Sequence, residues 1–293
     1  MDPMQQLSGL ATEWRTMTYN WRDCALYALA VGADGREPQY IYEKEMRCVP
    51  TFGVTPYWGT VNVTPKQPRP RSVPVLVEEA LQPAASYVNL DYEFFYHRPI
   101  DPLKGSLVYR DVLTDLFDRG EGRGMAVASR QEVFDEAGNP LCTNCCTTLF
   151  PTLGGYGGAP MPRRESRIPH RDPDLVAADQ VSKVQHLLYR LTGDTNLVHV
   201  DEEVAKSRGL DGPFVHDLCA FGFACRLAIG ALFPGHPEKL TRMYAAMKTV
   251  LYPDTPLELH LWQLSPGRAA FRLINRATGK AVLDRGELDW DEI

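Results

Sequence analysis

The stretch Tyr189–Asp201, Y-R-L-T-G-D-T-N-L-V-H-V-D, is followed eleven residues later by Pro213–Cys219, P-F-V-H-D-L-C. The first segment places the carboxylate of Asp194, the amide of Asn196 and the imidazole of His199 within six positions. A carboxylate and an imidazole five residues apart on a loop can converge on one water molecule, and such a pair can move protons on and off a substrate. The stretch therefore predicts an acid–base site on a loop between two helices.

The segments around this loop predict an α+β domain. We expect a helix over Val176–Leu191, which ends at Gly193, and a short helix that begins at Asp201, a plausible N-cap. The apolar segment Pro213–Phe233 predicts a long buried helix. Four strand-like segments complete the chain, namely Met243–Leu251, Leu257–Leu264, Ala269–Asn275 and Ala281–Trp290.

The first half of the chain repeats this order of elements. Residues Trp21–Val31 predict a helix that stops at Gly32. Segments rich in Val, Tyr, Phe and Thr predict long antiparallel strands at Ser86–Phe95, Ser106–Leu116, Gly124–Phe134 and Leu141–Phe150. The hexapeptide Y-A-L-A-V-G at 27–32 resembles Y-R-L-T-G at 189–193, but nothing after Gly32 reproduces D-x-N-x-x-H. The sequence thus predicts a duplicated fold whose first half binds rather than catalyses.

Residues 154–173 are dominated by Gly, Pro and Arg and lack an apolar period, which indicates a surface linker. The predicted organisation is therefore an N-terminal domain over 1–153, this linker, and a C-terminal domain over 174–293 that carries the acid–base loop.

The composition indicates which partners and which cellular compartment to expect. The hydrophobic content of 44% and charged content of 23% fit a globular protein, and the net charge of −6 argues against nucleic acid as a partner. Pro213–Phe233 carries His216, Asp217 and Arg226, each costly inside a bilayer, so we expect no membrane span. Seven cysteines, a start without a signal region and an end without S-K-L predict a reduced, cytoplasmic location.

Two groups of side chains resemble metal sites. Cys142, Cys145 and Cys146 form C-x-x-C-C, but no second pair at zinc-ligand spacing follows, so we interpret them as core residues of a strand. His199 with Asp194 and His216 is a second combination of three ligand types. We expect no metal at either place and interpret His216 as a residue that packs or orients the following helix.

The loop and the following H-D-L-C-A-F-G at 216–222 resemble the signature of enoyl-CoA hydratase 2, the R-specific MaoC-like dehydratases. The first half shares the resemblance through T-Y-N-W-R-D-C-A-L-Y-A-L-A-V-G-A at 18–33 and V-P-T-F-G-V at 49–54. The resemblance implies a double hot dog fold, in which each half wraps a long antiparallel sheet around a central helix. It also implies that the C-terminal half carries catalysis and that the N-terminal half makes room for the acyl chain.

The family's functional residues map onto this sequence one by one. Asp194 and His199 match the catalytic pair, Asn196 matches an assisting amide, and Asp217 stands where a backbone N–H holds the thioester oxygen. The resemblance implies a hydro-lyase that converts a trans-2-enoyl-CoA into an (R)-3-hydroxyacyl-CoA without metal or redox cofactor. Fatty acid metabolism is the expected setting, and a homodimer is compatible with the sequence.

Two positions depart from the family pattern. Leu197 replaces a proline, which loosens the loop without removing a reacting group, and Asp217 replaces a glycine. Asp217 keeps the N–H but adds a carboxylate near developing negative charge, so we expect its side chain to turn away. Lys206 and Arg208 are candidates for the phosphates of coenzyme A. A hot dog thioesterase and a catalytically impaired acyl-CoA-binding subunit remain as alternatives.

Overall fold

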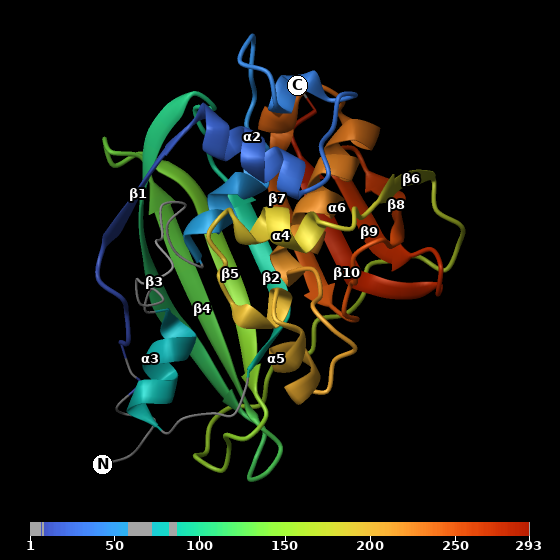
Figure 1. Ribbon diagram of the computed structural model, residues 1–293. Coiled ribbons are helices and arrows are strands. Elements are labelled where there is room, and N and C mark those ends of the chain that lie inside the picture. The colour runs from blue at the N-terminus through green and yellow to red at the C-terminus, as the bar shows by residue number, and fades with distance from the viewer. Residues whose placement is uncertain (1–6, 8, 58–71, 82–86, 293) are drawn as a thin grey trace.

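In the part of the chain that the structure describes, each half supplies five strands and several helices. The computed structural model describes residues 7, 9–57, 72–81 and 87–292 (Figure 1). The first half comprises β1 (Arg15–Asn20), α2 (Trp21–Ala30), η1 (Pro38–Tyr40), η2 (Pro50–Tyr57), α3 (Val73–Ala80), β2 (Val88–Tyr96), β3 (Lys104–Asp118), β4 (Met125–Phe134) and β5 (Pro140–Phe150). The second half comprises β6 (Leu175–Gln180), α4 (Gln185–Arg190), η3 (Leu197–His199), α5 (Glu202–Ser207), α6 (Asp217–Leu232), η4 (Pro237–Lys239), β7 (Leu240–Met247), β8 (Pro256–Ser265), β9 (Arg268–Asn275) and β10 (Lys280–Trp290).

The strands form one antiparallel sheet in the order β1-β3-β4-β5-β2-β7-β10-β9-β8-β6. The two halves meet at the pairing of β2 with β7, which we call the β2–β7 seam. Outward from this seam the strands follow the order β2, β5, β4, β3, β1 in the first half and the equivalent order β7, β10, β9, β8, β6 in the second half. The same fold therefore occurs twice, as the double hot dog prediction requires. The two predicted sheets are joined into one, because Asp91–Phe95 of β2 pairs with Arg242–Ala246 of β7.

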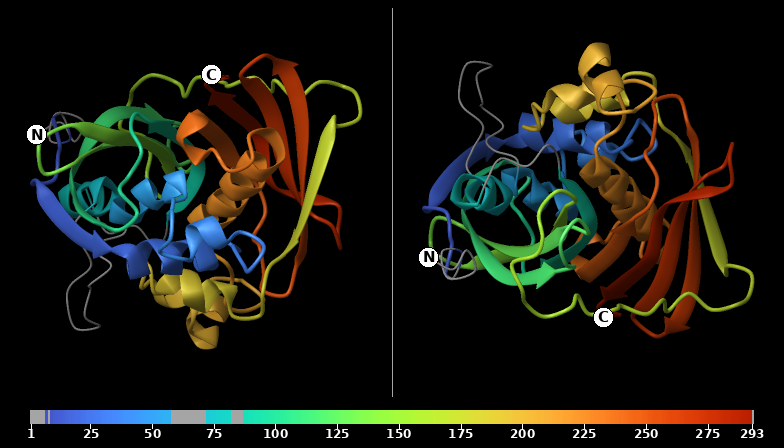
Figure 2. Two further views of the ribbon diagram at one scale, coloured as in Figure 1. Left: turned by 90° about the horizontal axis from the view of Figure 1, so that it is seen from above. Right: turned by 90° about the horizontal axis from the view of Figure 1, so that it is seen from below.

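The strands of the second half curve around α6, the predicted long apolar helix (Figure 2). All but the ends of α6 is buried, and the Phe221 ring packs edge-on against Tyr92 of β2 with centroids 5.6 Å apart. In the described residues of the first half, the 3-10 helix η2 contacts β2, β3 and β5, where the resemblance implied a central α-helix, while α2 contacts β1 and α3 contacts β3. Gly53 and Pro56 lie inside η2, and both residue types disfavour a regular α-helix.

The two halves dock through the carboxyl end of α2, where helix carbonyls lack intrahelical partners. Gln185 of α4 donates from Nε2 to the carbonyl oxygens of Leu29 and Ala30, at 2.9 and 2.7 Å. Gly32 follows with a φ of +88°, and a Cβ there would lie 2.2 Å from the Phe223 ring of α6. Only glycine fits this contact, so the Gly32 that ends the predicted helix also allows the halves to approach.

Several predicted elements are confirmed, and others are wrong. Helix α2, strands β2 to β5, helix α5 with its Asp201 cap, and strands β8 to β10 lie within a few residues of their predicted positions. Ser86, the predicted start of β2, lies outside the described residues. The strand expected at Met243–Leu251 is β7, which begins and ends earlier.

The helix expected over Val176–Leu191 is wrong, because this segment contains strand β6 and the shorter helix α4. Residues 175–180 pair with β8 and complete the sheet edge, so tertiary pairing overrides the helical pattern. Strand β1 and helix α3 were not predicted at all.

The remaining expectations concern the linker, the cysteines and the membrane. Residues 151–174, all of which the structure describes, contain no helix or strand.

The C-x-x-C-C sequence lies in β5, where Cys142 and Cys146 are buried, and no cysteine forms a disulfide. Within the described part of the chain, no helix combines the length and the apolar character that a bilayer crossing requires.

Candidate active site

A tight loop after α4 brings the predicted acid–base residues together. The Thr192 hydroxyl donates to the Tyr189 carbonyl at 2.7 Å, and Gly193 then adopts a φ of +132° that reverses the chain. Asp194 follows, and its Oδ1 accepts from the backbone N–H of Asn196 at 3.0 Å, which forms an Asx turn. The Asn196 side chain in turn caps η3, which ends at His199. The loop sequence itself therefore folds Asp194 towards His199.

The contacts of His199 fix which of its ring nitrogens faces the site. Nδ1 lies 2.9 Å from the backbone carbonyl oxygen of Phe214, and a carbonyl can only accept, so Nδ1 carries the hydrogen. In the neutral ring, Nε2 then keeps a lone pair. The ring is buried between Phe214 and His216, whose ring centroids lie 4.4 and 3.6 Å away. His199 is thus oriented as a proton acceptor.

His216, the N-cap residue of α6, contacts Asp194. Its Nε2 lies 3.4 Å from the backbone carbonyl oxygen of Asp194 and 3.8 Å from its carboxylate Oδ2. Burial, and to a lesser degree the neighbouring His199, lowers the pKa of His216 to about 3, although the charge of Asp194 acts in the opposite direction. His216 therefore stays neutral and holds Asp194 in place without neutralising the carboxylate.

Asp194, His199 and His216 form one buried cluster. One polar atom from each lies within 4.8 Å of those of the other two, and it is the one group of three such side chains among the described residues that could hold a metal ion. The cluster faces a cavity of about 470 Å³. The loop, the start of α6 and the end of the β2–β7 seam line this cavity, so both halves contribute to it.

Asp217 is the first residue of α6 and lines the same cavity. The first N–H groups of a helix have no intrahelical acceptor and carry partial positive charge, so the Asp217 N–H is available to an oxygen atom. Burial, and secondly the charge of Asp194, raises the pKa of the Asp217 carboxyl to about 6. The carboxyl is therefore within electrostatic reach of Asp194, and its orientation away from a reacting group stays a prediction.

The two candidate phosphate-binding residues are placed differently. Arg208 lines the cavity, whereas the exposed Lys206 ammonium forms an ion pair with Glu202 one helical turn earlier. The sequence predicted that His216 packs or orients the following helix, and it did not indicate the contact with Asp194, because nothing local connects it to that residue 22 positions earlier. It also missed Lys248 and Leu90, which line the cavity at the seam.

Comparison with known families divides this chain into two matched regions. Residues 165–284 match the MaoC like domain, and residues 17–151 match the MFE-2 hydratase 2 N-terminal domain. The boundary between the two matches falls at the irregular segment between β5 and β6.

Individual relatives cover nearly the whole chain. It is 29% identical to the peroxisomal enoyl-CoA hydratase 2 of Arabidopsis thaliana, over 91% of this chain and 88% of that protein. It is also 29% identical to 3-hydroxyacyl-thioester dehydratase Y of Mycobacterium tuberculosis, over 96% of both chains. A crystal structure of a MaoC-like dehydratase from Phytophthora capsici superimposes with a TM-score of 0.87 at 25% identity, over the full length of both chains. In the longer multifunctional relatives, the matched part is 45% of the relative or less. These likenesses confirm the predicted fold.

Proposed function

Because this chain belongs to the MaoC-like dehydratases and carries a hydratase 2 N-terminal domain, we propose that it hydrates a trans-2-enoyl-CoA reversibly. The product is a 3-hydroxyacyl-CoA, to which we assign the R configuration. The names of the enoyl-CoA hydratase 2 and 3-hydroxyacyl-thioester dehydratase relatives support a hydro-lyase with a thioester substrate. The buried Asp194–His199–His216 cluster, which lines a cavity, is the observation that carries the proposal.

The proposed reaction needs two proton transfers and one stabilised oxygen. A water oxygen bonds to the β-carbon of the enoyl thioester while Asp194 and His199 accept one of the water protons. The α-carbon then receives a proton from the same pair, so the elements of water are added across the double bond. Separations up to 4.8 Å between the polar atoms suit a shared water, because two hydrogen bonds of about 2.8 Å meeting at an angle span that distance.

The thioester oxygen gains negative charge between these two steps. We assign its stabilisation to the N–H of Asp217, reinforced by the positive end of α6. Removal of one such donor in other enzymes lowers the rate by about 10²–10³. The assisting role of Asn196 is to hold the Asp194 carboxylate through its backbone N–H and to cap η3 through its side chain.

We propose that this chemistry needs no metal or redox cofactor. The Nε2 of His216 faces the backbone carbonyl of Asp194, and such a nitrogen carries a hydrogen rather than a lone pair for a metal ion. Activity that survives exhaustive chelation, with no stoichiometric metal by elemental analysis, is the expected result. Activity lost on chelation and restored by zinc would contradict it.

The proposal is tested with a panel of trans-2-enoyl-CoA thioesters, followed by loss of the conjugated-thioester absorbance and by chiral analysis of the product. We expect hydration to the R alcohol without release of free coenzyme A thiol. Release of thiol would instead identify a thioesterase. The raised pKa of Asp217 favours one further candidate, an impaired acyl-CoA-binding subunit, which would bind the thioester with no absorbance change. A cytoplasmic location also stays a proposal, and imaging of the tagged protein tests it.

A further inference from the structure

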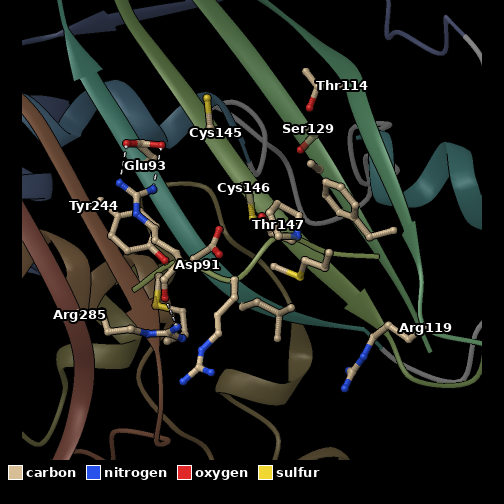
Figure 3. A pocket seen from close by; sticks show the side chains of 18 of the residues that line it. Asp91, Glu93, Thr114, Arg119, Ser129, Cys145, Cys146, Thr147, Tyr244 and Arg285 are labelled. Carbon is tan, nitrogen blue, oxygen red and sulfur yellow. Dashed lines mark hydrogen bonds and ion pairs between the residues drawn. The ribbon is translucent and has the colours of Figure 1, made fainter. Parts of the chain in front are cut away.

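A second cavity, of about 560 Å³, lies on the outer face of the sheet (Figure 3). Its lining includes Asp91 and Glu93 of β2, which alternate with Tyr92, whose ring packs against α6 on the inner face. Successive strand residues point to opposite faces, so this cavity and α6 lie on opposite sides of the sheet. Residues 161–164 of the irregular segment before β6 form its other wall.

The outer cavity is basic although the whole chain is acidic. Five basic residues and two acidic residues line it, whereas the net charge of the chain is −6. Glu93 is paired with Arg164 and Arg242. Among the described residues, no carboxylate lies within ion-pair distance of the other four basic side chains. These four are Arg119, Arg163, Lys248 and Arg285. Figure 3 shows Arg119 and Arg285 at two sides of the cavity. The surplus of unpaired positive charge suits a ligand with several phosphate groups.

The outer cavity adjoins the catalytic cavity at one end of the seam. Leu90, Met247 and Lys248 line both cavities. The pairing of β2 with β7 stops at Asp91 and Ala246, just before this place. The Lys248 N–H donates to the Val282 carbonyl at 3.0 Å, so the chain after β7 follows β10 and leaves β2. The sheet therefore parts where the two cavities meet.

We propose that the phosphates of coenzyme A bind in the outer cavity, while the pantetheine arm passes between Leu90 and Met247 to the catalytic cavity. This inference rests on the proposed function. Coenzyme A joins a nucleotide that carries phosphates to a thin, unbranched arm, and the thioester lies at the far end of that arm. The exposed Lys248 stands at the rim between the two cavities, and Arg119 and Arg163 reach the nucleotide from the outer side. Lys206, whose charge is engaged by Glu202, has no part in binding.

Single substitutions Arg119→Ala, Arg163→Ala and Lys248→Ala test this placement. The substrates are crotonyl-CoA and crotonyl N-acetylcysteamine thioester, which has the same reacting group but no phosphates. Each substitution should raise KM for crotonyl-CoA about threefold to tenfold, as expected for loss of one solvent-exposed phosphate contact, and leave kcat unchanged. KM for the short thioester should stay the same in Arg119→Ala and Arg163→Ala, because these two residues do not line the catalytic cavity. Arg285 is not substituted, because its guanidinium also holds the Arg164 carbonyl.

Lys183→Ala and Lys206→Ala are the matched controls, since both lysines are exposed and lie outside the outer cavity. Neither should change KM for crotonyl-CoA. The ratio of KM for crotonyl-CoA to KM for the short thioester could be the same in wild type and in all three cavity variants. With hydration intact, this result would overturn the inference and leave the proposed function standing. A higher KM in Lys206→Ala alone would place the phosphates beside α5 and overturn it too. Failure of the wild type to hydrate either thioester would instead contradict the proposed function.

Discussion

The imidazole rings of His199 and His216 lie nearly parallel, with centroids 3.6 Å apart and planes inclined by 25°. Burial raises the free energy of a charged His216, and a positive charge on the neighbouring His199 ring would add to this effect. The pKa of His216 is accordingly lowered to about 3. The two histidines thus have different roles, since His216 stays neutral beside Asp194 while His199 presents Nε2 to the cavity.

His216 should make the protein less stable in acid. Its folded-state pKa of about 3 lies below the ordinary value of 6.5, so the unfolded state binds more protons between these two values. The contribution of His216 to the free energy of unfolding is therefore lost as the pH falls from 6.5 towards 3. At pH 5 this loss amounts to about 2 kcal/mol relative to pH 7. Urea denaturation at pH 7 and pH 5 should show this extra loss in wild type but not in His216→Gln. An identical pH dependence in both proteins would contradict the assignment.

Asp217 should limit activity above pH 6. Its carboxyl is protonated below a pKa of about 6, and above that value its negative charge, even with the side chain turned away, raises the free energy of the charge that develops on the thioester oxygen. Asp217→Asn and Asp217→Gly keep the backbone N–H and remove this charge. We expect kcat/KM of both variants to exceed that of wild type by about tenfold at pH 8, with little difference at pH 5. A ratio of variant to wild-type kcat/KM that is the same at pH 5 and pH 8 would contradict this effect of the carboxylate charge.

Arg226 of α6 should be essential for stability rather than for chemistry. Its buried guanidinium pairs with Glu37 from the first half and Asp179 of β6, and Nε donates to the Val31 carbonyl at 2.9 Å. Arg226→Met would leave two carboxylates without their partner and should lower the free energy of unfolding by about 3–5 kcal/mol. Adding Glu37→Gln and Asp179→Asn should recover much of this loss. If the triple variant is no more stable than Arg226→Met, the ion pairs do not explain the effect.

The sequence predicted the local part of the site and the repeated order of elements. Asp194, Asn196 and His199 are brought together by an Asx turn and a short capped helix, both of which depend on residues within the loop. The apolar run of α6 was equally clear, because it is buried along nearly all its length.

The rest of the structure depends on contacts between distant segments. Strand β6 has a helical pattern and forms a strand because β8 offers an unpaired edge. The join between the two halves pairs Asp91 with Ala246, which no local pattern indicates. For the same reason the contact of His216 with Asp194 and the boundary shared by the two cavities were not foreseen. Tyr27 and Tyr189, matched in the repeated motif, pack together with ring centroids 6.1 Å apart.

The central claim is that Asp194 and His199 act as one acid–base pair on a shared water. The most direct measurement is kcat/KM for crotonyl-CoA hydration by Asp194→Asn, His199→Ala and the double variant, with circular dichroism and thermal melting to establish that each is folded. Each single substitution should lower kcat/KM by about 10²–10⁴, and the double variant should be scarcely worse than the more damaged single variant, because both residues serve the same step. A folded double variant that retains activity within tenfold of wild type would contradict the account.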